Sequence, residues 1–141
     1  MMRSILCVLL LAWTLPALAA SPRSGFEPAP CAFRDVPADW AARNRVDCGW
    51  LQVPESRGKA GSRILRLWVA IARADAEPGR EDPLLYIHGG PGYATVDYVF
   101  PYFPQSKTWP AFRRTRDIVF FDQRGTGRSG PAFCESLAAT M

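Results

Sequence analysis

Two short apolar runs, each followed at once by a glycine-rich loop, most constrain how this chain can fold. The first run covers residues 84–87 (LLYI) and leads into 88–92 (HGGPG); the second covers 118–121 (IVFF) and leads into 122–129 (DQRGTGRS). Continuous apolar runs of this length are typical of strands covered on both faces, as in a parallel sheet. In open α/β sheets, the loops at the carboxyl ends of the strands are where ligands bind.

The segments around these runs complete a fold prediction. Residues 93–112, between the two runs, form a stretch with many aromatic side chains that is long enough for a crossover helix. Upstream, 49–54 (GWLQVP) has the character of a short strand, and 64–73 alternates with the period of a half-buried strand. We therefore predict an α/β fold: a β-hairpin, then strand, crossover helix and strand of a mainly parallel sheet.

Composition excludes some classes of protein. The chain has 141 residues, of which 48% are hydrophobic and 21% charged, enough apolar material for one folded domain. The net charge is +4, but the basic residues are spread along the chain, so no nucleic-acid partner is predicted. The densest basic group, Arg113, Arg114 and Arg116, is interpreted as a solvated helix face rather than a phosphate site.

The N-terminus has the pattern of a cleavable signal peptide. Residues 1–20 combine a basic start, an apolar run over 5–15 and small residues before a cut after Ala19 or Ala20. The apolar run is shorter than the roughly 20 residues that span a bilayer. We expect export to the periplasm or the medium, with no stable membrane anchor after cleavage.

Export changes how the cysteines are interpreted. Cys7 would leave with the signal, so that Cys31, Cys48 and Cys134 remain, an odd number in an oxidising compartment. A bridge between Cys31 and Cys48 would close a modest loop and stabilise the fold by roughly 3 kcal/mol. The spacing does not suit zinc, and the single histidine, His88, is far away, so no metal site is predicted. Cys134 is either a free thiol or pairs with a cysteine outside this sequence.

The two glycine-rich loops carry the predicted chemistry. Glycines at a strand end let the backbone turn sharply and direct its N–H groups outward. Outward amides beside a reacting carbonyl form an oxyanion hole, worth roughly 2.7–4 kcal/mol per donor in the transition state. A plain tight turn is the alternative for 88–92 alone, and the pair of loops is more specific than either. The sequence lacks a phosphate loop and a dinucleotide-binding fingerprint, so no cofactor is implied.

Together, 88–92 and 122–129 resemble the two early signatures of α/β-hydrolases of the proline iminopeptidase and tripeptidyl aminopeptidase family of serine peptidases. The upstream pairs Cys48-Gly49 and Val53-Pro54, followed by a hairpin, resemble the exported branch of that family. The resemblance covers roughly residues 45–134.

The resemblance assigns roles to individual residues. The Gly90 amide would contribute to an oxyanion hole, with Gly89 shaping the turn, and His88 would hold the loop by hydrogen bonds rather than act as the catalytic base. In the second loop, Asp122 and Arg124 would tie the turn and the glycines would permit it. The supporting residues implied are His88, Pro91, Gly92, Asp122, Arg124, Gly125 and Gly127.

The nucleophile of such an enzyme is missing from this sequence. An α/β-hydrolase serine sits in a G-x-S-x-G elbow, followed along the chain by the acid and the histidine. The nearest approach, residues 127–131 (GRSGP), has a glycine one place early and proline where the last glycine belongs, so Ser129 is not assigned as the nucleophile. His88 is the only histidine, and no Ser-His-Asp triad can be assembled.

These observations predict a domain organisation. Residues 1–20 are the expected signal peptide and 21–45 a Pro-rich arm leading into the domain. Residues 46–141 are the expected N-terminal part of an α/β-hydrolase domain, incomplete because the chain stops before the nucleophile elbow. Stopping there would leave the strand at 84–87 as an exposed edge, and 137–141 falls inside what looks like a starting helix.

The predicted function is that of an exported serine hydrolase, an aminopeptidase that releases residues from the N-termini of peptides through an acyl-enzyme. By itself, this 141-residue chain is predicted to be inactive. One alternative is an esterase on the same fold, because fold does not determine substrate. A second alternative is a short exported protein that binds a partner without catalysis.

Overall fold

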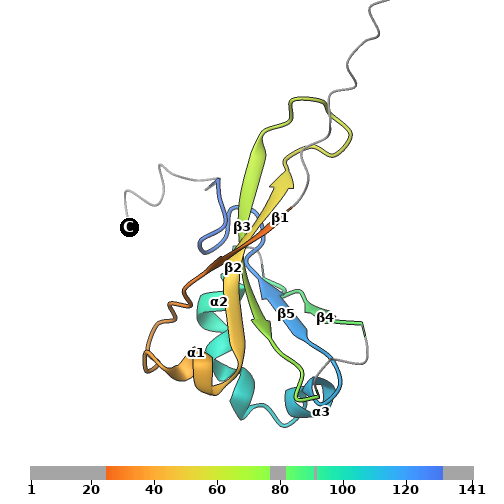
Figure 1. Ribbon diagram of the computed structural model, residues 1–141. Coiled ribbons are helices and arrows are strands. Elements are labelled where there is room, and N and C mark those ends of the chain that lie inside the picture. Colours follow the sequence, from red (N-terminus) through yellow and green to blue (C-terminus); the bar gives the residue numbers. More distant parts are fainter. Residues whose placement is uncertain (1–24, 77–81, 91, 132–141) are drawn as a thin grey trace, which may run out of the picture.

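The computed structural model describes residues 25–76, 82–90 and 92–131, which form a five-stranded mixed sheet with helices against it (Figure 1). The strand order is β1-β2-β3-β5-β4. The strands are β1 (Gly25–Ala29), β2 (Val46–Pro54), β3 (Ile64–Ala72), β4 (Leu84–Tyr86) and β5 (Ile118–Phe121), and the helices are α1 (Trp40–Arg43), α2 (Thr95–Tyr98), the 3₁₀ helix η1 (Phe100–Gln105) and α3 (Trp109–Arg113).

The α/β class is confirmed, but the prediction of a mainly parallel sheet is wrong for the described residues. Only β4 and β5 pair in parallel; β1, β2, β3 and β5 pair antiparallel in that order. The cause is the hairpin. It places β3 beside β5, so that the parallel pair continues an antiparallel meander.

The predicted hairpin is formed by β2 and β3, which pair from Val46 with Ala72 to Pro54 with Ile64. Its turn contains Gly58 and Gly61, both with positive φ, a conformation that glycine adopts without strain. Strand β2 begins three residues earlier than the predicted start at Gly49.

Strand β1 was not anticipated within the Pro-rich arm. Its residues are mostly exposed and do not alternate, and Pro28 is tolerated because β1 is an edge strand. It packs closely against Gly49 of β2, where an added Cβ would lie 2.5 Å from the Glu27 carbonyl oxygen. The absence of a side chain at Gly49 therefore lets β1 join the sheet.

Strand β3 departs from the half-buried pattern over its second half. Leu65 and Leu67 pack with Val53 in a small apolar cluster on one face. On the other face Trp68 and Ala70 belong to the main core. From Trp68 to Ala70 consecutive residues are buried, so both faces of the strand are covered there; the helices after β4 pack on the face of Trp68 and Ala70.

The main core lies between the sheet and the helices after β4. Val96 of α2 and Phe100 and Phe103 of η1 pack against Ile118 and Phe120 of β5. The rings of Phe100 and Phe120 meet at 4.8 Å between centroids in an edge-to-face arrangement, which aromatic pairs favour.

The predicted crossover helix is replaced by three short helices, α2, η1 and α3. Pro101 and Pro104 lie within η1, and Pro110 lies at the start of α3. Proline lacks the N–H that a continuous helix needs, so the length of this segment was a poor guide to its structure.

Strand β4 lies at an edge of the described sheet. Leu84 and Tyr86 pack against the core, but Leu85 is 55% exposed and Ile87 62% exposed, so one face of the run lacks its expected cover among the described residues. The second run fits better, because Ile118 and Phe120 are fully buried.

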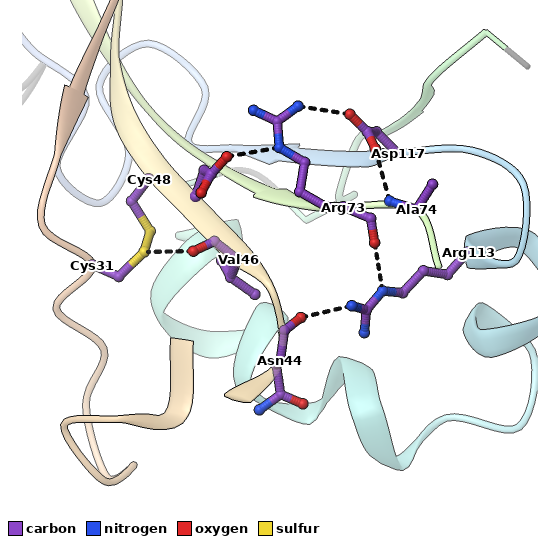
Figure 2. A network of polar contacts seen from close by, with 9 residues as sticks. Cys31, Asn44, Val46, Cys48, Arg73, Ala74, Arg113 and Asp117 are labelled. Atoms are coloured by element: carbon purple, nitrogen blue, oxygen red, sulfur yellow. Dashed lines mark hydrogen bonds and ion pairs between the residues drawn. A yellow bond between two sulfur atoms is a disulfide. The ribbon is translucent and has the colours of Figure 1, made fainter. Parts of the chain in front are cut away.

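The interpretation of Arg113 as part of a solvated helix face is wrong. Its side chain is only 14% exposed, and its guanidinium donates to the carbonyl oxygens of Arg73 at 2.7 Å and Asn44 at 2.8 Å (Figure 2). Arg73 in turn forms ion pairs with Asp47 and Asp117, both at 2.7 Å. These contacts join α3 to the ends of β2, β3 and β5.

A disulfide joins Cys31 to Cys48, with the Cα atoms 5.1 Å apart, and attaches the arm to β2 (Figure 2). Cys31 Sγ also lies 3.6 Å from the Val46 carbonyl oxygen, a contact without a hydrogen bond because a disulfide sulfur carries no proton. Cys134, Pro91, the predicted signal peptide and the helix start at 137–141 lie outside the described residues. Within those residues, no helix is long and apolar enough to cross a membrane.

Candidate functional site

The first glycine-rich loop begins directly after β4. Gly90 and Gly92 have φ values of +76° and +84°, which residues with a side chain rarely adopt. An added Cβ at Gly89, Gly90 or Gly92 would meet no atom within 4 Å, so the backbone here is open to an approaching molecule. The described glycines of this loop therefore leave their backbone exposed at the carboxyl end of β4.

His88 is held by contacts within the loop region. Its Nδ1 and the Tyr86 hydroxyl are 2.9 Å apart, and its ring lies 5.0 Å from that of Tyr93. The backbone oxygen of His88 accepts a hydrogen bond from the Gln123 side chain at 3.0 Å. Sequence reasoning missed Gln123, whose place beside Asp122 in the second loop was the available signal.

Asp122 links the second loop to the elements on both sides of it. Its N–H donates to the Trp68 carbonyl oxygen of β3 at 2.9 Å. Its carboxylate is fully buried and accepts from the N–H groups of Val96 at 2.9 Å and Arg128 at 3.1 Å. Burial raises the pKa of this carboxyl, and the two backbone hydrogen bonds partly oppose that rise.

Ser129 is a buried residue that holds the second loop by hydrogen bonds. It is 3% exposed, its hydroxyl donates to the Asp122 carbonyl oxygen at 2.7 Å, and it accepts from the Trp68 N–H at 2.8 Å. The hydroxyl thus closes the end of the second loop onto β3. A serine held in this way is not poised to attack a substrate.

The glycines of the second loop meet different demands. Gly127 has a φ of +50°, and an added Cβ would lie 2.2 Å from Asp122 Oδ2, so both conformation and space require glycine. Gly125 has a φ of +74°, and its N–H donates to the Ser129 carbonyl oxygen at 3.1 Å. Arg124, expected to tie its own turn, instead donates to the Glu55 carbonyl oxygen at 2.9 Å.

Arg128 is a further residue that sequence reasoning did not single out. Its guanidinium pairs with Asp97 of α2 at 3.0 Å and donates to the Ala32 carbonyl oxygen. It also lies over the Trp68 ring, 5.1 Å from the centroid, a cation–π geometry. One side chain therefore connects the second loop, α2 and the arm.

The structure brings the two loops together through Gln123 and Asp122. Among the residues that the structure describes it brings no Ser-His-Asp triad together, and the single histidine of the chain, His88, contacts Tyr86 beside the first loop. Among the described residues, no group of three or more His, Cys, Asp or Glu side chains could hold a metal ion. What the site offers chemically is a set of exposed backbone donors on a fixed loop.

Comparison with known proteins shows the family to which the chain belongs. No protein-family model matches the chain. A tripeptidyl aminopeptidase of Streptomyces coelicolor is 31% identical over 119 residues, which cover 84% of this chain and 21% of the relative. The chain is homologous to the N-terminal portion of α/β-hydrolases.

Two further relatives carry names that indicate different activities. Carboxylesterase B of Mycobacterium tuberculosis is 33% identical over 99 residues, which cover 70% of this chain and 18% of the relative. A putative proline iminopeptidase of Mycoplasma genitalium is 45% identical over 47 residues, which cover 33% of this chain and 13% of the relative. The chain spans about a fifth of the length of the Streptomyces coelicolor tripeptidyl aminopeptidase.

Proposed function

We propose that the protein is an exported serine hydrolase, an aminopeptidase that cleaves residues from the N-termini of peptides. One observation carries the proposal. The loop after β4 presents the open backbone of Gly89 and Gly90, and a hydrogen bond from Gln123 of the loop after β5 to the His88 carbonyl oxygen holds the start of that loop. Similarity to a tripeptidyl aminopeptidase supports a peptide substrate.

In this proposal the loop stabilises negative charge. A serine hydroxyl attacks the carbonyl carbon of the scissile bond, and a histidine takes its proton and returns it to the leaving amine. The Gly90 N–H donates to the oxygen that becomes negative, a stabilisation present chiefly in the transition state. Water then releases the acyl group from the serine. The serine and the histidine are residues other than Ser129 and His88.

The first experiment compares substrate classes with the protein purified from its source. Tripeptidyl and prolyl p-nitroanilides are expected to be hydrolysed faster than p-nitrophenyl acetate and butyrate. Turnover of esters alone would replace the peptidase with an esterase, the second candidate, which the similarity to carboxylesterase B favours. Turnover of neither class would overturn hydrolysis and leave a binding protein.

The second experiment tests Gly90 directly. Gly90→Ala strains a backbone at φ +76° and displaces the N–H, so kcat should fall by roughly 10²–10³, the cost of losing one oxyanion donor. Gly58→Ala is the matched control, because Gly58 has φ +78° and equal open space but lies in the β2–β3 turn. Equal loss of activity in both variants would show a stability effect and remove Gly90 from the oxyanion hole.

A further inference from the structure

A cleft of about 610 Å³ lies beside the first glycine-rich loop, where Gly92 forms part of its wall. Its other walls come from Tyr93 beside the first loop, from α2, from Arg34 of the arm and from Arg128 of the second loop. Its volume falls in the range of clefts that bind small ligands. The proposed oxyanion hole uses none of these side chains, so the cleft has no role in the chemistry described above.

Two tyrosines give the cleft an apolar wall. Tyr93 is 47% exposed and Tyr98 48% exposed, with the ring centroids 5.4 Å apart. Tyr93 also contacts the His88 ring, so this wall starts at the first loop. Adjacent aromatic rings that are half open to solvent are suited to contact an apolar part of a ligand while their hydroxyls stay hydrated.

The charges in the cleft favour an anion. Asp97 and Arg128 form an ion pair at 3.0 Å, and the Asp97 side chain is only 11% exposed, so these two charges neutralise one another. Arg34 is exposed and has no ion pair within the described part of the chain. Arg34 also lines a smaller neighbouring cleft of about 130 Å³, and Asp35 lines that smaller cleft but not the larger one. A guanidinium is therefore the one unneutralised charge that the described residues bring to this cleft.

The residues that precede Arg34 in the chain are anchored to the rest of the fold. The Cys31–Cys48 disulfide attaches the arm to β2, and the Phe33 ring packs on Phe100 of the main core at 5.3 Å. These anchors hold Arg34 across the cleft from α2, so that its guanidinium meets a ligand with little ordering cost in the backbone.

We propose that this cleft binds the C-terminal carboxylate of a short peptide substrate, with Arg34 as its ion-pair partner and Tyr93 and Tyr98 beside the adjoining side chain. The inference rests on the proposed aminopeptidase function. The N-terminus of such a substrate is an ammonium, which the positive cleft disfavours, so the cleft receives the other end. Guanidinium groups bind carboxylates with directed, charge-assisted hydrogen bonds. The enzyme then prefers short peptides with a free C-terminus.

The test compares one short peptide with its C-terminal amide, using the protein purified from its source and variants expressed there. The acid is expected to have the lower KM and a similar kcat. Arg34→Gln should raise KM for the acid by roughly five-fold, the effect of one solvent-accessible ion pair, and leave KM for the amide unchanged. Arg34→Lys should recover part of the preference. Arg114→Gln, an exposed arginine at a different cleft, should change neither substrate.

Binding is measured separately by calorimetry, with acetyl-Ala-Ala-Phe as acid and amide, because an aminopeptidase does not cleave an acetylated peptide. Hydrolysis with equal KM for acid and amide would overturn the carboxylate site and leave the proposed function standing. No hydrolysis, with Arg34-dependent binding of the acid, would retain the site and overturn the function. No hydrolysis and no preference in binding would overturn both.

Discussion

The buried carboxylate of Asp122 accepts a hydrogen bond from the backbone N–H of Val96 at 2.9 Å. Asp122 opens the loop after β5, and Val96 lies in α2, the helix that follows the loop after β4. This contact and the hydrogen bond from Gln123 Nε2 to the His88 carbonyl oxygen together connect the two glycine-rich loops.

Removing the Asp122 carboxylate should destabilise the protein. In Asp122→Ala, the N–H groups of Val96 and Arg128 lose their acceptor in a buried place, which costs about 1–3 kcal/mol for such groups. The free energy of unfolding at neutral pH is measured by urea titration. An unchanged midpoint would show that the loop is held by other contacts.

The same carboxylate should leave a pH signature. Burial raises its pKa in the folded state above the ordinary value of 3.8, so the folded state binds the proton more tightly than the unfolded state. Its contribution to stability is therefore largest below pH 3.8 and decreases as pH rises through the folded-state pKa. The unfolding free energy of wild type minus that of Asp122→Asn should fall from pH 3.5 to 6.5. A rise instead would mean that the hydrogen bonds outweigh burial.

Ser129→Ala should cost stability but spare catalysis. The hydroxyl satisfies the buried Trp68 N–H and the Asp122 carbonyl oxygen, so its loss should cost about 1–3 kcal/mol. The value of kcat should stay within ten-fold of wild type, whereas loss of a serine nucleophile costs about 10⁶-fold. Ser106→Ala, which removes a hydroxyl outside the core, is the control. A loss of activity near 10⁶-fold would make Ser129 the nucleophile after all.

Gly127→Ala should destabilise the protein more than Gly61→Ala. Both glycines have positive φ, but an added Cβ would collide with Asp122 Oδ2 at Gly127 and would meet nothing within 4 Å at Gly61. The second variant measures backbone strain alone, about 1–3 kcal/mol at most. The difference between the two midpoints in urea gives the steric part. Equal midpoints would contradict the close packing of the loop.

Loss of the Cys31–Cys48 disulfide should lower stability by about 3 kcal/mol, the entropic value for a loop of this size. The double variant Cys31→Ala/Cys48→Ala is compared with Cys134→Ala by urea unfolding, and peptide mapping without reduction checks the bridge in wild type. A map that shows Cys134 bonded to either cysteine would contradict the pairing.

Local sequence patterns predicted the strands that carry the site, but they did not predict contacts between residues far apart in the sequence. The apolar runs before HGGPG and DQRGTGRS located β4 and β5, because a run and its loop are adjacent in the sequence. Arg113 was misinterpreted and Arg128 was not singled out, because their partners, Asn44 and Ala32, lie 69 and 96 positions away. Nothing in the neighbouring sequence distinguishes such an arginine from a solvated one.

The elements that were predicted wrongly have other physical causes. The crossover helix was predicted from the length of the segment, whereas Pro101, Pro104 and Pro110 divide that segment into short helices. Strand β1 has no hydrophobic period to reveal it, because it lies at an exposed edge. What made it a strand is the space above Gly49, which depends on packing.

We propose that this chain supplies the oxyanion loop of a serine hydrolase whose nucleophile is not Ser129. The protein from its source is labelled with a fluorophosphonate, and the labelled peptide is identified by mapping. We expect one labelled serine, in a G-x-S-x-G peptide of the same polypeptide as HGGPG. Labelling of Ser129, or no labelling of a folded protein, would overturn this proposal.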